Sequence, residues 1–305
     1  MTASIEGRLY RIEVAGLLCW LLKDAAWVLV VPGVALPAAV LAMFIEVYIV
    51  SVRWKDDKPI QRAHNTAALL WLLGNASWLS GELLHDKATE GPRHFPWHLD
   101  PVLGSNERLY KRWIWLARGM FIAALVGLLT TYMGSICAKG QEPESYYPAS
   151  MMEPTPRVQP ALVFGIFTAE AYEGAFIGPW IVKDLCWTFQ LCWVALPFGL
   201  LVVVLIIDYI YIARTDVVFH FIELWWVVAN VVALTAELVL RDEYMWPRIT
   251  AGVMLLFATA VACAALCQAI PGKRRTQEAP PSEGSYLFGG QASARAVRSY
   301  RGFMA

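Results

Sequence analysis

The sequence predicts an all-α polytopic membrane protein made of two tandem repeats. Hydrophobic residues make up 58% of the 305-residue chain and charged residues only 16%, whereas soluble domains are about 25% charged. Several apolar stretches reach the roughly 20 residues that a helix needs to cross a bilayer. Polar residues also recur at matched spacing in the two halves of the chain, which indicates an internal duplication.

The apolar stretches fall into two sets of three, separated by a polar segment near the middle of the chain. We expect spans at 25–52, 65–85, 113–136, 188–213, 217–240 and 249–270. Strands of a membrane barrel would instead alternate apolar and polar residues in segments of about ten. The sequence shows no such alternation, so an α-helical bundle of about six spans follows.

Each half begins with an apolar segment that contains an adjacent lysine and aspartate. "WLLKDAAW" (20–27) and "WIVKDLCW" (180–187) share their polar and aromatic positions, which are Trp20, Lys23, Asp24 and Trp27 in the first half and Trp180, Lys183, Asp184 and Trp187 in the second. A lysine in the middle of a bilayer is costly. We therefore interpret 12–24 and 173–184 as short amphipathic pre-helices, in which tryptophan rings flank a lysine that snorkels to the interface. The alternative is that both segments cross the membrane, which gives eight spans in a four-plus-four arrangement.

The matched spacing continues through the later helices of each half. Asn75 and Glu82 follow a tryptophan at the same intervals as Asn230 and Glu237. Because such a co-linear set is hard to obtain by chance, we predict a first repeat over 1–137 and a second over 171–271. Three spans per repeat would make the repeats inverted, and four would make them parallel.

Two segments outside the repeats have few residues that a core could bury. Residues 138–170 form a Pro-rich linker between the repeats, and 272–305 form a basic tail that we expect to be disordered. With six or with eight spans, most lysines and arginines fall on the side of the membrane that holds both termini. The positive-inside rule then places both termini in the cytoplasm, although the sequence does not indicate which membrane is involved.

The two asparagines are the first candidates for a functional site. Each lies inside an apolar span, where an unpaired amide is costly, so it must face another helix or an aqueous cavity. One role is a hydrogen bond between helices, with a contribution of about 1 kcal/mol. The other role is a ligand or ion site between the halves, to which Glu82 and Glu237 would add carboxylates about two turns farther along the same helical face.

Each half has one further acid inside its first span. Glu46 and Asp208 precede a basic residue that ends the span. An ionisable side chain inside a span indicates a functional site by default. We therefore add both residues to the candidates for ion or proton binding.

These features favour a transporter or channel for a cation or small polar solute, because transporters are often built from repeats. The alternative is a non-catalytic scaffold or accessory subunit of a membrane complex. The sequence shows no nucleophile with a paired base, no Gly-rich phosphate loop and no metal-spaced His and Cys set, so we expect no enzyme activity, metal or cofactor. The expected partners are the bilayer and other membrane subunits, including further copies of the chain. The formal net charge of zero gives no indication of a nucleic-acid partner.

Overall fold

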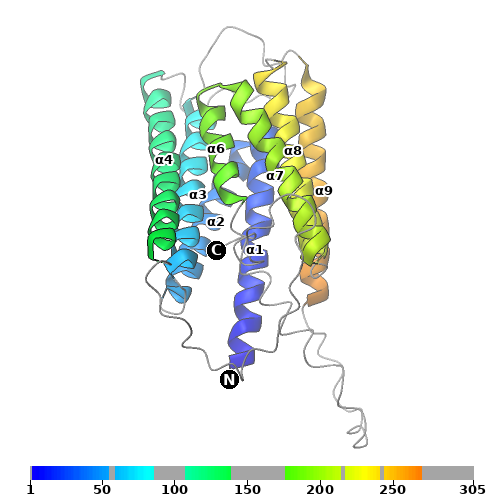
Figure 1. Cartoon of the computed structure of the whole chain (residues 1–305). Coiled ribbons are helices and arrows are strands. Elements are labelled where there is room, and N and C mark those ends of the chain that lie inside the picture. Colours follow the sequence, from blue (N-terminus) through cyan, green and yellow to red (C-terminus); the bar gives the residue numbers. More distant parts are fainter. Residues whose placement is uncertain are drawn as a thin grey trace, which may run out of the picture.

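The chain folds into a bundle of helices that run roughly along one axis (Figure 1). The computed structural model describes residues 2–54, 59–85, 107–138, 176–213, 217–240 and 244–269. All regular structure in these ranges is helical, as the sequence predicts. The helices are α1 (Thr2–Val28), α2 (Pro32–Arg53), α3 (Pro59–His85), α4 (Glu107–Ala138), α6 (Ile177–Thr188), α7 (Cys192–Ala213), α8 (Val217–Leu238) and α9 (Met245–Ala269). The predicted linker and tail lie outside the described residues, apart from the start of the linker at 138.

The bundle exposes apolar side chains and buries charged ones. Phe44 is 70% exposed and Trp193 is 89% exposed, whereas Lys23 and Lys183 are 1% and 2% exposed. Water would disfavour this distribution, but hydrocarbon favours it, because lipid tails solvate apolar side chains and not charges. Five helices (α2, α4, α7, α8 and α9) are long and apolar enough to cross a membrane. The fold is consistent with a multi-pass helical membrane protein.

The predicted span at 65–85 is the one that is not among these five helices. It lies in α3, which is 27 residues long but carries several polar side chains that lower its hydropathy. Many of them are buried inside the bundle, including Asn65, Asn75 and Ser77. The α3 helix is therefore surrounded by protein more than by lipid.

The prediction of a short pre-helix at 12–24 needs correction. These residues lie within α1, a helix of 27 residues that continues past the Lys23-Asp24 pair to Val28. The helix does not break near the charged pair because lysine and aspartate neutralise each other inside the bundle. The corresponding helix of the second half, α6, is described over 12 residues. Within the described ranges four helices precede the predicted linker and four follow it.

The contacts between tryptophan rings show the relative direction of three helices. Pairs of tryptophans separated by seven residues on one helix contact pairs with the same separation on the next, so these helices must run in the same direction. The ring pairs are Trp20 with Trp71, Trp27 with Trp78, Trp71 with Trp180 and Trp78 with Trp187, with centroids 4.6, 4.8, 5.5 and 5.1 Å apart. Helices α1 and α6, which open the two halves, are thus parallel. Inverted halves would make them antiparallel.

The turns that follow α1 and α6 have the same conformation. Val30 and Gln190 have positive φ angles of 57° and 59°, and in both turns the next residue donates its N–H to a carbonyl five residues earlier. These bonds are Val31 to Ala26 at 2.7 Å and Leu191 to Cys186 at 2.9 Å. This pattern is the Schellman motif, in which the left-handed position usually holds glycine.

Replacing Gln190 with glycine should stabilise the protein. The side chain is exposed, and glycine removes the steric cost of the left-handed conformation, so we expect a gain of about 1 kcal/mol. Ala123→Gly, at an exposed position inside α4, should lower stability by about 1 kcal/mol. Thermal unfolding in detergent measures both changes. If both variants changed stability in the same direction, the steric cost assigned to Gln190 would be contradicted.

Helices α3 and α4 pack closely because glycines line their contact. A Cβ atom on Gly74 would lie 2.5 Å from Cε1 of Phe121, and one on Gly81 would lie 2.9 Å from Cβ of Trp113. Small residues allow two membrane helices to approach in this way. The two helices therefore contact over at least two turns of backbone.

Gly81→Ala should lower stability by about 1–3 kcal/mol, because the Trp113 Cβ atom cannot move without its helix. Gly127 of α4 is the matched control, since a Cβ atom there meets nothing within 4 Å. Gly127→Ala should leave stability unchanged or raise it. Chemical unfolding in mixed micelles distinguishes the two, and an equal effect of both variants would show that the close approach has no role.

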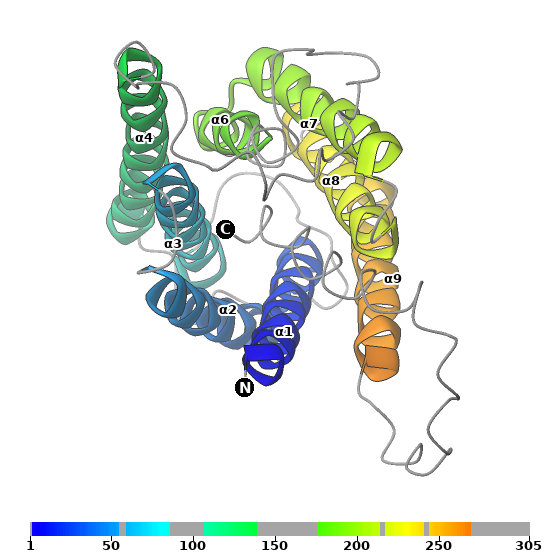
Figure 2. The ribbon, with the colours of Figure 1, turned by 60° about the horizontal axis from the view of Figure 1, so that its bottom comes forward.

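The two halves exchange contacts through their first helices. Helix α1 packs against α9 of the second half, and α6 packs against α4 of the first (Figure 2). Because α6 also contacts α3, the charged segments of α1 and α6 face the motif-bearing helices of the opposite half. This arrangement builds the candidate site.

Candidate functional site between the halves

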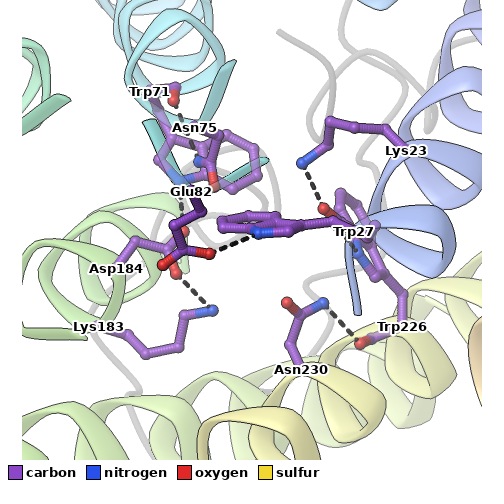
Figure 3. A network of polar contacts seen from close by, with 10 residues as sticks. Lys23, Trp27, Trp71, Asn75, Glu82, Lys183, Asp184, Trp226 and Asn230 are labelled. Atoms are coloured by element: carbon purple, nitrogen blue, oxygen red, sulfur yellow. Dashed lines mark hydrogen bonds and ion pairs between the residues drawn. The ribbon is translucent and has the colours of Figure 1, made fainter. Parts of the chain in front are cut away.

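Two equivalent hydrogen bonds join the halves (Figure 3). The indole Nε1 of Trp71 on α3 donates to Asp184 Oδ2 on α6 at 2.6 Å. In the same way, Trp226 Nε1 on α8 donates to Asp24 Oδ2 on α1 at 2.7 Å. All four side chains are buried. Each half thus supplies one aspartate to the other half and receives one indole N–H.

The lysine beside each aspartate completes a buried ion pair. Lys183 Nζ lies 2.7 Å from Asp184 Oδ1, and Lys23 pairs with Asp24 in the same way. Each carboxylate therefore accepts from an ammonium and from an indole, which offsets the cost of removing the charges from water. The sequence correctly placed tryptophan rings around the lysines. Neither ammonium snorkels to the interface, however, because its partner aspartate is buried beside it.

Four tryptophans close the middle of the boundary between the halves. They are Trp20, Trp71, Trp180 and Trp226, which we call the tryptophan cluster. Equivalent contacts have similar lengths: the two ring pairs within the halves have centroids 4.6 and 4.8 Å apart, and the two pairs between the halves 5.5 and 5.6 Å apart. The four rings are thus arranged with approximate twofold symmetry between the halves.

The two asparagines bond within their own helices. Asn75 Nδ2 donates to the Trp71 carbonyl at 3.1 Å, and Asn230 Nδ2 donates to the Trp226 carbonyl at 3.0 Å. Among the described residues no hydrogen bond joins one amide to the other. Each asparagine fixes the helical turn whose tryptophan reaches the opposite aspartate, and Asn230 also lines a cavity.

The two glutamates that follow the asparagines occupy similar positions with different partners. Glu82 accepts from the indoles of Trp27 at 2.7 Å and Trp78 at 2.6 Å. Glu237 accepts from Arg248 of α9 at 3.3 Å. Both glutamates line the same cavity between the halves.

Glu46 and Asp208 are both buried, at 1% and 3% exposure, but they are not equivalent. Glu46 lies nine residues after Pro37, whereas Asp208 lies eleven residues after Pro197, so the two face different neighbours. Glu46 lines a cavity beside the tryptophan cluster. Asp208 lines neither this cavity nor the one that Asn230, Glu82 and Glu237 line.

Two small cavities lie along the boundary, each with a volume of about 20 Å³, which is enough for about one water molecule. The first, the tryptophan cavity, is enclosed by the cluster together with Glu46, Ala68, Phe176 and Ile177. The second, the polar cavity, is lined by Asp24, Trp27, Glu82, Trp187, Asn230, Glu237 and Arg248, among others. On each of the parallel helices α1, α3, α6 and α8, residues of the tryptophan cavity precede those of the polar cavity. The cavities therefore follow one another along the bundle axis.

Sequence reasoning missed the roles of Trp71 and Trp226. Both residues belong to the repeated motif, but spacing alone does not show which acid an indole will reach on another helix. It also missed the ion pair between Arg53 and Glu13, whose residues are 40 positions apart. The sequence did contain one signal for a charged site here. Glu46 and Arg53 of α2 are seven residues apart and therefore lie on one helical face.

Comparison with protein-family models, with curated proteins and with solved structures found no match. The described ranges contain no group of three or more His, Cys, Asp or Glu side chains that could hold a metal ion.

Proposed function

We propose that the chain is an internally duplicated transporter or channel for a cation or small polar solute, which passes along the boundary between the halves. The observation that carries this proposal is the succession of two cavities along the four inner helices, with the reciprocal bonds of Asp24 and Asp184 beside them. We further propose eight crossings in two parallel repeats. Most lysines and arginines then remain on the side of the termini, which favours a cytoplasmic location for both.

The structure corresponds to a closed form under this proposal. A cavity of about 20 Å³ admits water but no larger solute. Passage would require the halves to separate, and this would break the bonds from Trp71 to Asp184 and from Trp226 to Asp24. The two bonds act together as a latch, which we call the Trp-Asp latch.

A scaffold remains the second candidate because one observation favours it. The lysines, aspartates and asparagines of the network all have partners within the bundle, and the cavities are small. A network of this kind also interlocks helices without any ligand. The two functions differ in whether a solute stabilises the protein.

A thermal-shift screen separates the two candidates. Wild type, Asn75→Leu and Asn230→Leu are melted in detergent with a panel of monovalent cations and small polar solutes. A ligand at a hundred times its Kd stabilises the protein by about 2.7 kcal/mol. We expect Asn230→Leu to lose this shift because Asn230 lines the polar cavity, and Asn75→Leu to retain it as the matched control. If no solute shifts the wild type while both variants lose stability, the scaffold function replaces the transporter.

A further inference from the structure

Glu46 is a buried acid without a hydrogen bond to any described residue. Its side chain is 1% exposed, and its Oε1 atom has no partner in the part of the chain that the structure describes. A lone buried carboxylate is strongly disfavoured, because nothing replaces its interactions with water. The carboxylate must therefore either gain a positively charged partner or be neutralised by a proton.

Among the described residues, the charged groups that act on Glu46 are one arginine and one acid, which together with Glu46 leave one negative charge in excess. Helix α2 packs against α1 and α3. Glu13 of α1 and Arg53 of α2 act on Glu46 electrostatically, and they form an ion pair with each other. Helix α3 contributes one buried histidine, His64, whose Nε2 lies 2.6 Å from the Tyr132 hydroxyl. Two acids and one arginine thus share a buried site, which becomes neutral when it gains one positive charge.

The tryptophan cavity beside Glu46 has room for one water molecule. The indole Nε1 of Trp20, which is 4% exposed, also lacks a hydrogen-bond partner among the described residues, and Trp20 lines the same cavity. A water there could accept from the indole and donate to the carboxylate, which would satisfy both groups. The wall offers one carboxylate and otherwise uncharged side chains, so it lacks the set of oxygen ligands that hard cations require.

Among the described residues no acid of the second half lines the tryptophan cavity. The acid of that half near the cluster is Glu223, three residues before Trp226, at the position that Ala68 occupies in the first half. Glu223 Oε2 lies 3.0 Å from His220 Nδ1, so this buried acid has a basic partner. Glu223 is therefore a matched control for Glu46.

We propose that Glu46 binds and releases a single proton through the water of the tryptophan cavity. A hydronium ion in the cavity gives its proton to the carboxylate, an O–H bond forms on Glu46, and a neutral water remains; release reverses the step. If the proposed transport function holds, this proton is the ion coupled to the solute. The proton site itself does not depend on that function.

Infrared difference spectroscopy on the full-length protein in lipid nanodiscs tests the proposal. We expect the wild type at neutral pH to show the carbonyl stretch of a protonated, buried carboxylic acid that shifts in D₂O. Glu46→Gln should remove the band, Glu223→Gln should retain it, and Glu46→Asp should move it. Adding Na⁺, K⁺ or NH₄⁺ should leave the band in place.

Two outcomes would overturn the proton site. Absence of a Glu46-dependent acid band at neutral pH would show that the carboxyl stays charged, and loss of the band on adding K⁺ or NH₄⁺ would show that a cation occupies the site. If Glu46→Gln fails to fold, the Glu46→Asp shift decides the assignment. The measurement requires no solute, so a band without any solute effect in the thermal screen would reject transport and keep the proton site.

Discussion

Replacing Asp184 with alanine should lower the free energy of unfolding by about 3–5 kcal/mol, because it leaves a buried lysine without its counter-charge. Lys183 is 2% exposed and has Asp184 as its ion-pair partner at 2.7 Å. The same change frees the Trp71 indole, which bonds to Asp184 across the boundary. Chemical unfolding in mixed micelles, followed by circular dichroism, measures the loss.

Two further variants test whether the effect arises from the pair. Asp24→Ala should cost a similar amount, since Asp24 has the equivalent lysine and indole partners. Adding Lys183→Met to Asp184→Ala should recover much of the loss, because no unpaired charge then remains. A loss below about 1 kcal/mol for both single variants, as for exposed ion pairs, would show that water reaches the pairs.

Arg53→Met should also lower the free energy of unfolding by about 3–5 kcal/mol, because it removes the positive charge that pairs with Glu13 and acts on Glu46. Arg53 pairs with Glu13, and their side chains are 11% and 3% exposed. The loss should shrink as the pH falls, since protonation neutralises the acids. Unfolding of wild type and variant at several pH values measures this trend.

Glu13→Gln is the rescue for this variant. In the Arg53→Met background it removes one acid and should restore part of the lost stability. Lys111→Met serves as the control, because Lys111 and its partner Glu107 are 62% and 64% exposed and exposed pairs contribute about 0–1 kcal/mol. A loss for Arg53→Met that does not depend on pH would contradict the charge balance assigned to this site.

The repeated spacing in the sequence pointed to the residues of the site but could not show how they meet. The Trp-Lys-Asp-Trp and Trp-Asn-Glu patterns each identify residues of the network. Which aspartate each indole reaches depends on how the halves are arranged, and spacing within one helix carries no information about that. The sequence therefore predicted the network's members and missed the Trp-Asp latch.

The length of α1 shows a second limit of prediction from the sequence. The cost of a lysine in a bilayer argued for a pre-helix that ends at the charged pair, whereas α1 continues to Val28. This cost applies only where lipid surrounds the lysine. In the structure Lys23 faces Asp24 and two tryptophans, so that cost does not apply, and only the tertiary packing reveals this.

Opening of the boundary between the halves is the step that any transport along it requires. A membrane-impermeant thiol reagent measures it in proteoliposomes, using a variant whose six native cysteines are serines. Asn230→Cys, in the polar cavity, should react slowly, when the halves separate, and Trp71→Phe should speed the reaction because it removes one bond of the Trp-Asp latch. Val253→Cys, on the lipid-facing surface at 58% exposure, should not react. If Asn230→Cys stays unreactive in both backgrounds and with every solute tested, the boundary is sealed and the proposed pathway is contradicted.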